Sequence, residues 1–158
     1  MNIANLIFNA LEAIGVVAGV IFAVIEWREH KKIRNAKMLL EFSCIFENNP
    51  AVAAFIQKID YGENWYDNGK FHDTNFEKTA DYALGILCHF IRMIENKIID
   101  EKDFNALQYI IQRTLRNSYT QKYFKFLIEF TNKSETTFPF EPLLRYGREH
   151  RLLNDNFN

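Results

Sequence analysis

Glycine, proline and cysteine are scarce in this sequence of 158 residues, which contains six glycines, three prolines and two cysteines. Because glycine and proline interrupt regular structure, a chain with so few of them favours long helices. Cys44 and Cys88 lie in helical patterns, and neither has a second cysteine or a histidine at metal-ligand spacing. We therefore expect two reduced thiols in the core, with no metal site and no cofactor.

An excess of charge is also missing, since the formal net charge is −1 and the isoelectric point is about 6.4. A general nucleic-acid-binding protein is basic, so this balance argues against that class and leaves only a local RNA contact open. The sequence lacks a glycine-rich phosphate loop, a C-x-x-C pair and a serine nucleophile elbow. It also lacks the basic n-region and the A-x-A cleavage pattern of a secretory signal.

Apolar residues are abundant at 48%, and aromatic residues make up 15% of the chain. That composition supplies a core, and the length suits one domain with one appendage. Helix signals recur along the chain, and no strand is expected. We predict a first helix that runs unbroken to Phe46, a second over 51–61 with Asn49 as its cap, and a third over 75–96 that begins with the capping box Thr74 to Glu77. Three more helices follow. Asp100 caps the fourth, the fifth starts at Asn117 or Ser118, and the last runs from Pro142 to about Leu152.

The segment from Leu6 to Ile25 is long enough as a helix to cross a bilayer, which requires roughly 20 apolar residues. Trp27 and a basic cluster follow it, which is the pattern of a cytoplasmic membrane flank. The sequence therefore predicts an all-α fold with one N-terminal transmembrane helix in residues 1–27 and a cytoplasmic helical bundle in 28–158. The expected location is the bacterial inner membrane, single-pass, with the N-terminus outside and lipid as one partner.

Polar and small residues interrupt this segment and gather on about a third of the helix circumference. A carboxylate facing lipid is costly, so we expect this stripe to face water or other copies of the helix. Gly15 and Gly19 form a GxxxG pattern that lets backbones approach closely, and Ala23 extends it. We accordingly predict a homo-oligomer with Gly15, Gly19 and Ala23 at the contact and a channel lined by Asn5, Asn9 and Glu12. The alternatives are a soluble helix buried in an oligomer and an interfacial helix lying flat on a membrane.

Arg145 and His150 form the pattern R-x4-H in the last predicted helix. This pattern in a small helical bundle resembles the HEPN superfamily, many of whose members are metal-independent ribonucleases. The resemblance implies catalytic roles for Arg145 and His150, because RNA cleavage needs a cation on the phosphate and a group that moves a proton. A spacing of five residues places the two side chains about 140° apart on a regular helix. They converge only through distortion near Gly147 or by pairing between subunits, and an ordinary basic surface helix is the alternative.

The anchor, the helical bundle and the R-x4-H pattern together resemble the membrane accessory proteins of type VI-B CRISPR systems. The resemblance implies a ring, with eight copies as the expected number, that enhances the antiphage defence of an RNA-guided RNA nuclease by depolarising the inner membrane. It also implies that the HEPN-like motif can be structural, so we lean against an enzyme. A membrane-tethered HEPN ribonuclease and a non-catalytic membrane scaffold are the alternative functions.

Overall fold

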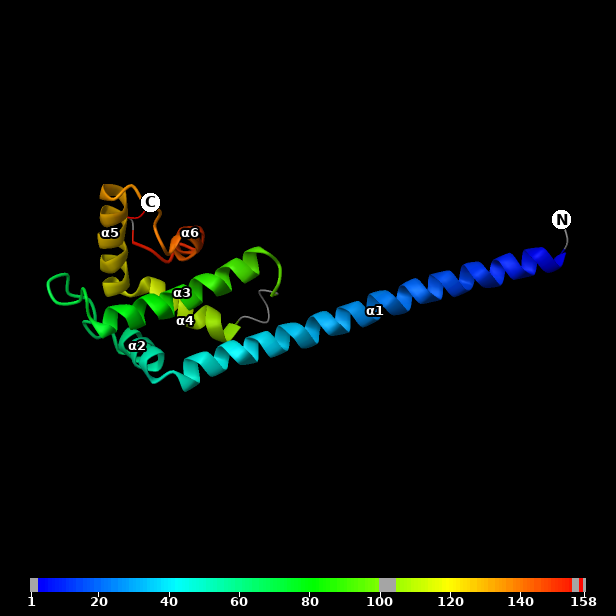
Figure 1. Ribbon diagram of the computed structural model, residues 1–158, viewed down its shortest axis with the longest axis horizontal. Coiled ribbons are helices and arrows are strands. Elements are labelled where there is room, and N and C mark those ends of the chain that lie inside the picture. Colours follow the sequence, from blue (N-terminus) through cyan, green and yellow to red (C-terminus); the bar gives the residue numbers. More distant parts are fainter. Residues whose placement is uncertain (1–2, 100–104, 155–156, 158) are drawn as a thin grey trace. The chain divides into compact units, whose positions relative to one another are not determined.

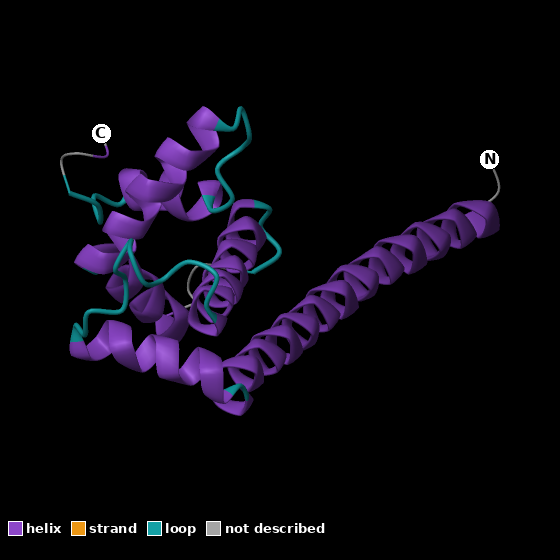
Figure 2. Ribbon diagram, turned by 60° about the vertical axis from the view of Figure 1, so that its left-hand side comes forward, coloured by secondary structure: helices purple, strands orange, loops and turns teal. Residues whose placement is uncertain are grey.

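The computed structural model describes residues 3–99, 105–154 and 157, except for the side chains of residues 3–14, 39, 42–43, 46–47 and 106. Over these residues the chain forms helices and connecting loops without a strand, as Figure 2 shows. The all-helical part of the fold prediction is therefore confirmed. The helices are α1 (Ile3–Asn48), α2 (Pro50–Tyr61), α3 (Asn75–Glu95), α4 (Asn105–Arg116), α5 (Ser118–Lys133) and α6 (Glu141–Glu149), labelled in Figure 1.

The chain divides into two compact units, Met1–Ser43 and Cys44–Asn158. The first unit consists of most of α1, which continues past residue 27 without a break (Figure 1). The second unit contains α2 to α6.

No helix in the described part of the chain has both the length and the apolar character needed to cross a membrane. In the sequence, the uninterrupted apolar run of this helix is 13–25, between Glu12 and Glu26. As a helix these 13 residues span about 20 Å, which is less than a hydrocarbon core of about 30 Å. The predictions of a transmembrane helix in residues 1–27, of a membrane protein and of a single-pass inner-membrane location are therefore wrong.

Helix α3 supplies eight buried side chains to the core of the second unit. It packs against α2 and α6, while α4 packs against α2, α5 and α6. The buried side chains of α3 are Ala80, Ala83, Leu84, Ile86, Leu87, Cys88, Phe90 and Ile91. Burial raises the pKa of the Cys88 thiol to about 11, which makes it a packing group and a poor nucleophile at neutral pH.

Side-chain caps begin three helices of this unit at the predicted residues. Asn49 Oδ1 accepts hydrogen bonds from the Ala51 and Val52 amides, at 3.1 and 3.3 Å. Thr74 Oγ1 accepts from the Glu77 amide at 3.1 Å, and Asn117 caps α5. Each cap pairs amides that the first helical turn leaves without partners. The predicted cap of α4, Asp100, lies outside the described residues.

Four helices of the second unit end in the same way. A residue at the C-cap (after α2) or directly after the C-cap (after α3, α5 and α6) adopts a left-handed backbone conformation, and the next amide donates a hydrogen bond to the carbonyl five residues earlier at 2.8 to 3.0 Å. This is the Schellman motif, in which glycine usually takes the left-handed position. The residues at that position are Gly62 after α2, Lys97 after α3, Glu135 after α5 and Arg151 after α6.

Candidate functional site

Helix α6 carries the R-x4-H residues and is fixed in the second unit by its apolar face. Leu143 and Leu144 are buried in that face. A Cβ atom added at Gly147 would lie 2.8 Å from Leu153 Cγ, so glycine is what lets the C-terminal segment pack against this helix. Distortion near Gly147, one of the two routes by which Arg145 and His150 could converge, is not seen, because α6 continues as a helix to Glu149.

Arg145 is bound by Glu95, the last residue of α3. Arg145 Nη2 donates to both carboxylate oxygens of Glu95 at 2.7 and 2.8 Å, and Arg145 Nε donates to Oε1 at 3.1 Å. The hydrogen bonds and the charge of Glu95 raise the pKa of Arg145 above its ordinary value. A carboxylate therefore occupies the guanidinium fork that would otherwise bind a phosphate.

His150 is the C-cap of α6, and its ring packs against Tyr146 and not against Arg145 or Glu95. Its amide donates to the Tyr146 carbonyl at 3.0 Å, and its ring centroid is 4.1 Å from that of Tyr146. Within the described residues, no hydrogen bond or ring contact joins His150 to Arg145. The structure thus places the two predicted catalytic residues on one short helix without bringing them together.

The predicted oligomer contact lies in the first unit. Gly15 and Gly19 are exposed, and a Cβ added at either would meet no atom within 4 Å. Ala23 is also exposed, so the GxxxG strip is open. The predicted pore-lining residues Asn5, Asn9 and Glu12 belong to the part of α1 whose side chains lie outside the described residues.

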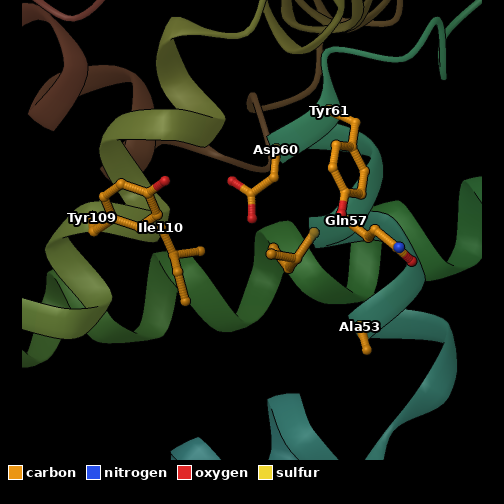
Figure 3. A pocket seen from close by; sticks show the side chains of 7 residues that line it. Ala53, Gln57, Asp60, Tyr61, Tyr109 and Ile110 are labelled. Carbon is orange, nitrogen blue, oxygen red and sulfur yellow. The ribbon is translucent and has the colours of Figure 1, made fainter.

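A groove of about 490 Å³ lies between α2 and α4 on the second unit. Figure 3 shows Asp60 between the side chains of Tyr61 and Tyr109. Arg113 Nε lies 3.2 Å from Asp60 Oδ1, and Arg113 Nη2 also donates to the Asp60 backbone carbonyl. Because Arg113 already forms an ion pair with the Asp60 carboxylate, Asp60 does not indicate which kind of ligand the groove would bind.

A polar cluster around His72 was not predicted from the sequence. His72 Nδ1 lies 2.8 Å from Glu77 Oε1, and His72 Nε2 lies 3.1 Å from Asn68 Oδ1. Glu77 Oε2 also accepts from the Asp73 amide at 2.7 Å. The capping box identified Glu77 as the start of a helix, but no spacing in the sequence assigns the carboxylate to His72.

No protein-family model matches the chain, and neither a curated protein nor a solved structure matches it. The likenesses to HEPN domains and to type VI-B accessory proteins therefore remain predictions from the sequence.

Proposed function

We propose that this protein is a self-assembling, non-catalytic accessory protein. In this proposal α1 joins copies of the chain, and the unit of α2 to α6 is presented to a partner. The observation that supports it is the exposure of large apolar side chains on α1. The exposed fractions are 62% for Val16, 58% for Val17, 59% for Val20, 54% for Ile21, 72% for Phe22 and 49% for Ile25.

A second copy of α1 is the occupant that best suits this surface. Fully burying an aliphatic or aromatic side chain contributes about 1.5–3 kcal/mol, so four such residues per copy offset an association cost of about 4–15 kcal/mol. The open strip of Gly15, Gly19 and Ala23 supplies the close approach between helices. Apolar contact and small residues thus lie on the same stretch of α1.

The arrangement of α6 supports a non-catalytic role. Glu95 holds the Arg145 guanidinium through both carboxylate oxygens, and His150 rests against Tyr146. Phosphate binding at Arg145 would first have to break a charge-assisted bidentate pair. The motif therefore serves to attach α6 to α3 in our proposal.

Light scattering of the purified full chain tests assembly and gives the number of copies. We expect a defined oligomer, with eight copies if the resemblance holds. Phe22→Gln and Gly19→Leu should each weaken association about tenfold or more, since each removes buried apolar contact or blocks helix approach. Tyr82→Gln is the matched control, because Tyr82 is 52% exposed on α3 and lies outside α1. A wild-type monomer at micromolar concentration would refute the proposal.

The functional link to an RNA-guided RNA nuclease is part of this proposal and has its own test. Cells that carry such a nuclease are challenged with phage, with and without this protein. We expect fewer plaques with the wild-type chain and a smaller reduction with Phe22→Gln. Equal plaque counts with and without the chain would remove the link and leave assembly to be judged by light scattering.

A further inference from the structure

Helix α3 presents one narrow strip of its surface to solvent. Lys78, Tyr82, His89 and Arg92 are exposed along it, and the half-buried Gly85 lies at its centre. Successive members are four or three residues apart, so the strip covers only about a quarter of the helix circumference. Alternating spacings of four and three residues are those of a seam along which two helices pack. We call these five residues the α3 strip.

The α3 strip carries positive charge that the second unit does not neutralise. The acidic side chains of α3 are all bound elsewhere, Glu77 by His72, Asp81 by Tyr123 and Glu95 by Arg145. Within the described residues, the side chains of Lys78 and Arg92 have neither a hydrogen bond nor an ion pair. Arg145 thus holds the carboxylate that could otherwise pair with Arg92, three residues before it on α3. Two unpaired cations on an exposed face suit an anionic partner.

Gly85 leaves the backbone of the α3 strip uncovered. Glycine in the interior of a helix lowers stability relative to alanine, because it loses more conformational freedom on folding. The described residues do not use the space that this glycine leaves, since a Cβ atom added there would meet no atom within 4 Å. The opposite holds at Gly147, where Leu153 fills the space. The open backbone at Gly85 therefore permits close approach by a second molecule.

We propose that the α3 strip docks an acidic helix of the partner protein. This inference rests on the proposed function, in which the unit of α2 to α6 is presented to a partner. Lys78 and Arg92 are about four helical turns apart, or about 21 Å along the axis. Two carboxylates at that separation on the partner helix bind both cations. Tyr82, which is 52% exposed, packs on the partner between them.

A nucleic acid suits the α3 strip less well than a protein helix does. The affinity for a nucleic acid grows with the number of phosphates that lysine and arginine neutralise. Lys78 and Arg92 are the lysine and arginine of the strip, and the net charge of the whole chain is −1. Two cations at a fixed separation therefore favour a partner with few, well-placed carboxylates.

Fluorescence anisotropy of the full chain with labelled, stapled helical peptides tests the docking surface. A matched peptide carries two glutamates about 21 Å apart on one face. A second peptide of the same composition carries them about 10 Å apart, and a third has glutamine in their place. We expect the matched peptide to bind about tenfold tighter than either of the others, and salt to weaken it. Equal binding of the three peptides overturns the proposal.

Substitutions in the α3 strip locate the binding. Lys78→Gln with Arg92→Gln should weaken the matched peptide about tenfold or more. Lys122→Gln with Lys125→Gln is the matched control, because it removes the same charge from exposed positions of α5 and should bind as wild type. Lys78→Glu with Arg92→Glu should instead bind a matched peptide that has lysines in place of the glutamates. An equal loss in the two glutamine pairs would mean unspecific attraction to charge and would overturn the proposal.

Gly85→Leu separates docking from folding. Leucine favours a helix, and its Cβ atom meets no atom of the described residues, so the thermal midpoint should not fall. The peptide should nevertheless bind about tenfold more weakly, because the side chain covers the open backbone. Wild-type affinity in a folded Gly85→Leu chain would contradict close approach and overturn the proposal.

The peptide measurement is independent of self-assembly, because each peptide has one binding face. Phe22→Gln should therefore bind the matched peptide as wild type does. A chain that assembles without binding the peptide refutes the docking surface alone, whereas a monomeric chain that binds it refutes only assembly. A single-stranded RNA of about 10 nucleotides is the last probe. RNA that binds tighter than the matched peptide, and is lost with Lys78→Gln and Arg92→Gln, would overturn the proposal and assign the strip to nucleic acid.

Discussion

Tyr123 and Asp81 form a short hydrogen bond inside the second unit. The Tyr123 hydroxyl donates to Asp81 Oδ1 at 2.6 Å, and Tyr123 is 1% exposed. Burial raises the pKa of Asp81 above its ordinary value, and the hydrogen bond from Tyr123 opposes that rise. The carboxylate is therefore held charged at neutral pH in a site that favours its neutral form.

Asp81→Asn should raise the free energy of unfolding at pH 7, because the amide oxygen still accepts from Tyr123 while the desolvated charge is gone. A folded-state pKa above the unfolded value means that wild type gains stability as pH falls, so the two proteins should converge near pH 4. Urea unfolding at both pH values measures this. Tyr123→Phe, which leaves the carboxylate without its donor, should lower stability by about 1–3 kcal/mol. An Asp81→Asn variant less stable than wild type at pH 7 would contradict the argument.

The role of Arg145 and His150 is also decided at the residue scale. We expect no cleavage of labelled RNA without metal by the wild-type chain, Arg145→Ala or His150→Ala. Glu95→Gln removes the charge that binds the guanidinium and is the variant best placed to reveal latent activity. Cleavage by wild type or Glu95→Gln that disappears in both alanine variants would show an active ribonuclease motif.

Two glycines in helices provide a matched test of packing at the scale of the elements. Gly147→Ala in α6 should destabilise the second unit by about 1–3 kcal/mol, since the new methyl group would meet Leu153 Cγ at 2.8 Å. Gly85→Ala in α3 should stabilise it by about 0.5–1 kcal/mol, because no atom lies within 4 Å and alanine favours the helix. Thermal unfolding of both variants measures the difference, and an unchanged or raised midpoint in Gly147→Ala would refute the contact with Leu153.

Substitutions at the helix ends test the cost of the left-handed backbone conformation in both directions. Lys97 and Glu135 occupy left-handed positions that disfavour side chains with a Cβ atom. Lys97→Gly and Glu135→Gly should each raise the free energy of unfolding by up to about 1 kcal/mol, whereas Gly62→Ala should lower it by about 1 kcal/mol. Denaturant midpoints check all three. A destabilised Lys97→Gly would mean that its side chain contributes more than the backbone conformation costs.

Local signals in the sequence were sufficient for most helix boundaries but not for the contacts of the site. Asn49, Thr74 and Asn117 predicted helix starts because a cap acts within its own turn. The last helix ends at Glu149, short of the predicted Leu152, because Arg151 takes the left-handed conformation without being glycine. Glu95 and Arg145 are 50 positions apart, so no periodicity could pair them. The transmembrane prediction treated Leu6 to Ile25 as one span although Asn9 and Glu12 interrupt it, so that only residues 13–25 form an uninterrupted apolar run.

At the scale of the whole molecule, the two units should respond differently to protein concentration. The second unit has its own buried core, whereas the apolar side chains of α1 from Val16 to Ile25 are exposed in a single copy. An isolated helix without packing is marginally stable in water. Dilution should therefore reduce the far-ultraviolet helix signal while the near-ultraviolet signal of the second unit stays constant. Phe22→Gln should lose the concentration dependence, and parallel changes in both signals would argue against independent units.

A single oxygen atom, Asn117 Oδ1, joins the start of α5 to Trp65, which is distant in the sequence. It accepts from the Tyr119 and Thr120 amides at 2.9 and 3.1 Å and from the Trp65 indole at 3.2 Å. The two amides are local and form with the first turn of α5, whereas the indole must arrive across 52 residues of sequence. We therefore expect Trp65 to dock after the first turn of α5 has formed, and its fluorescence should report that step in a chain with Trp27→Phe.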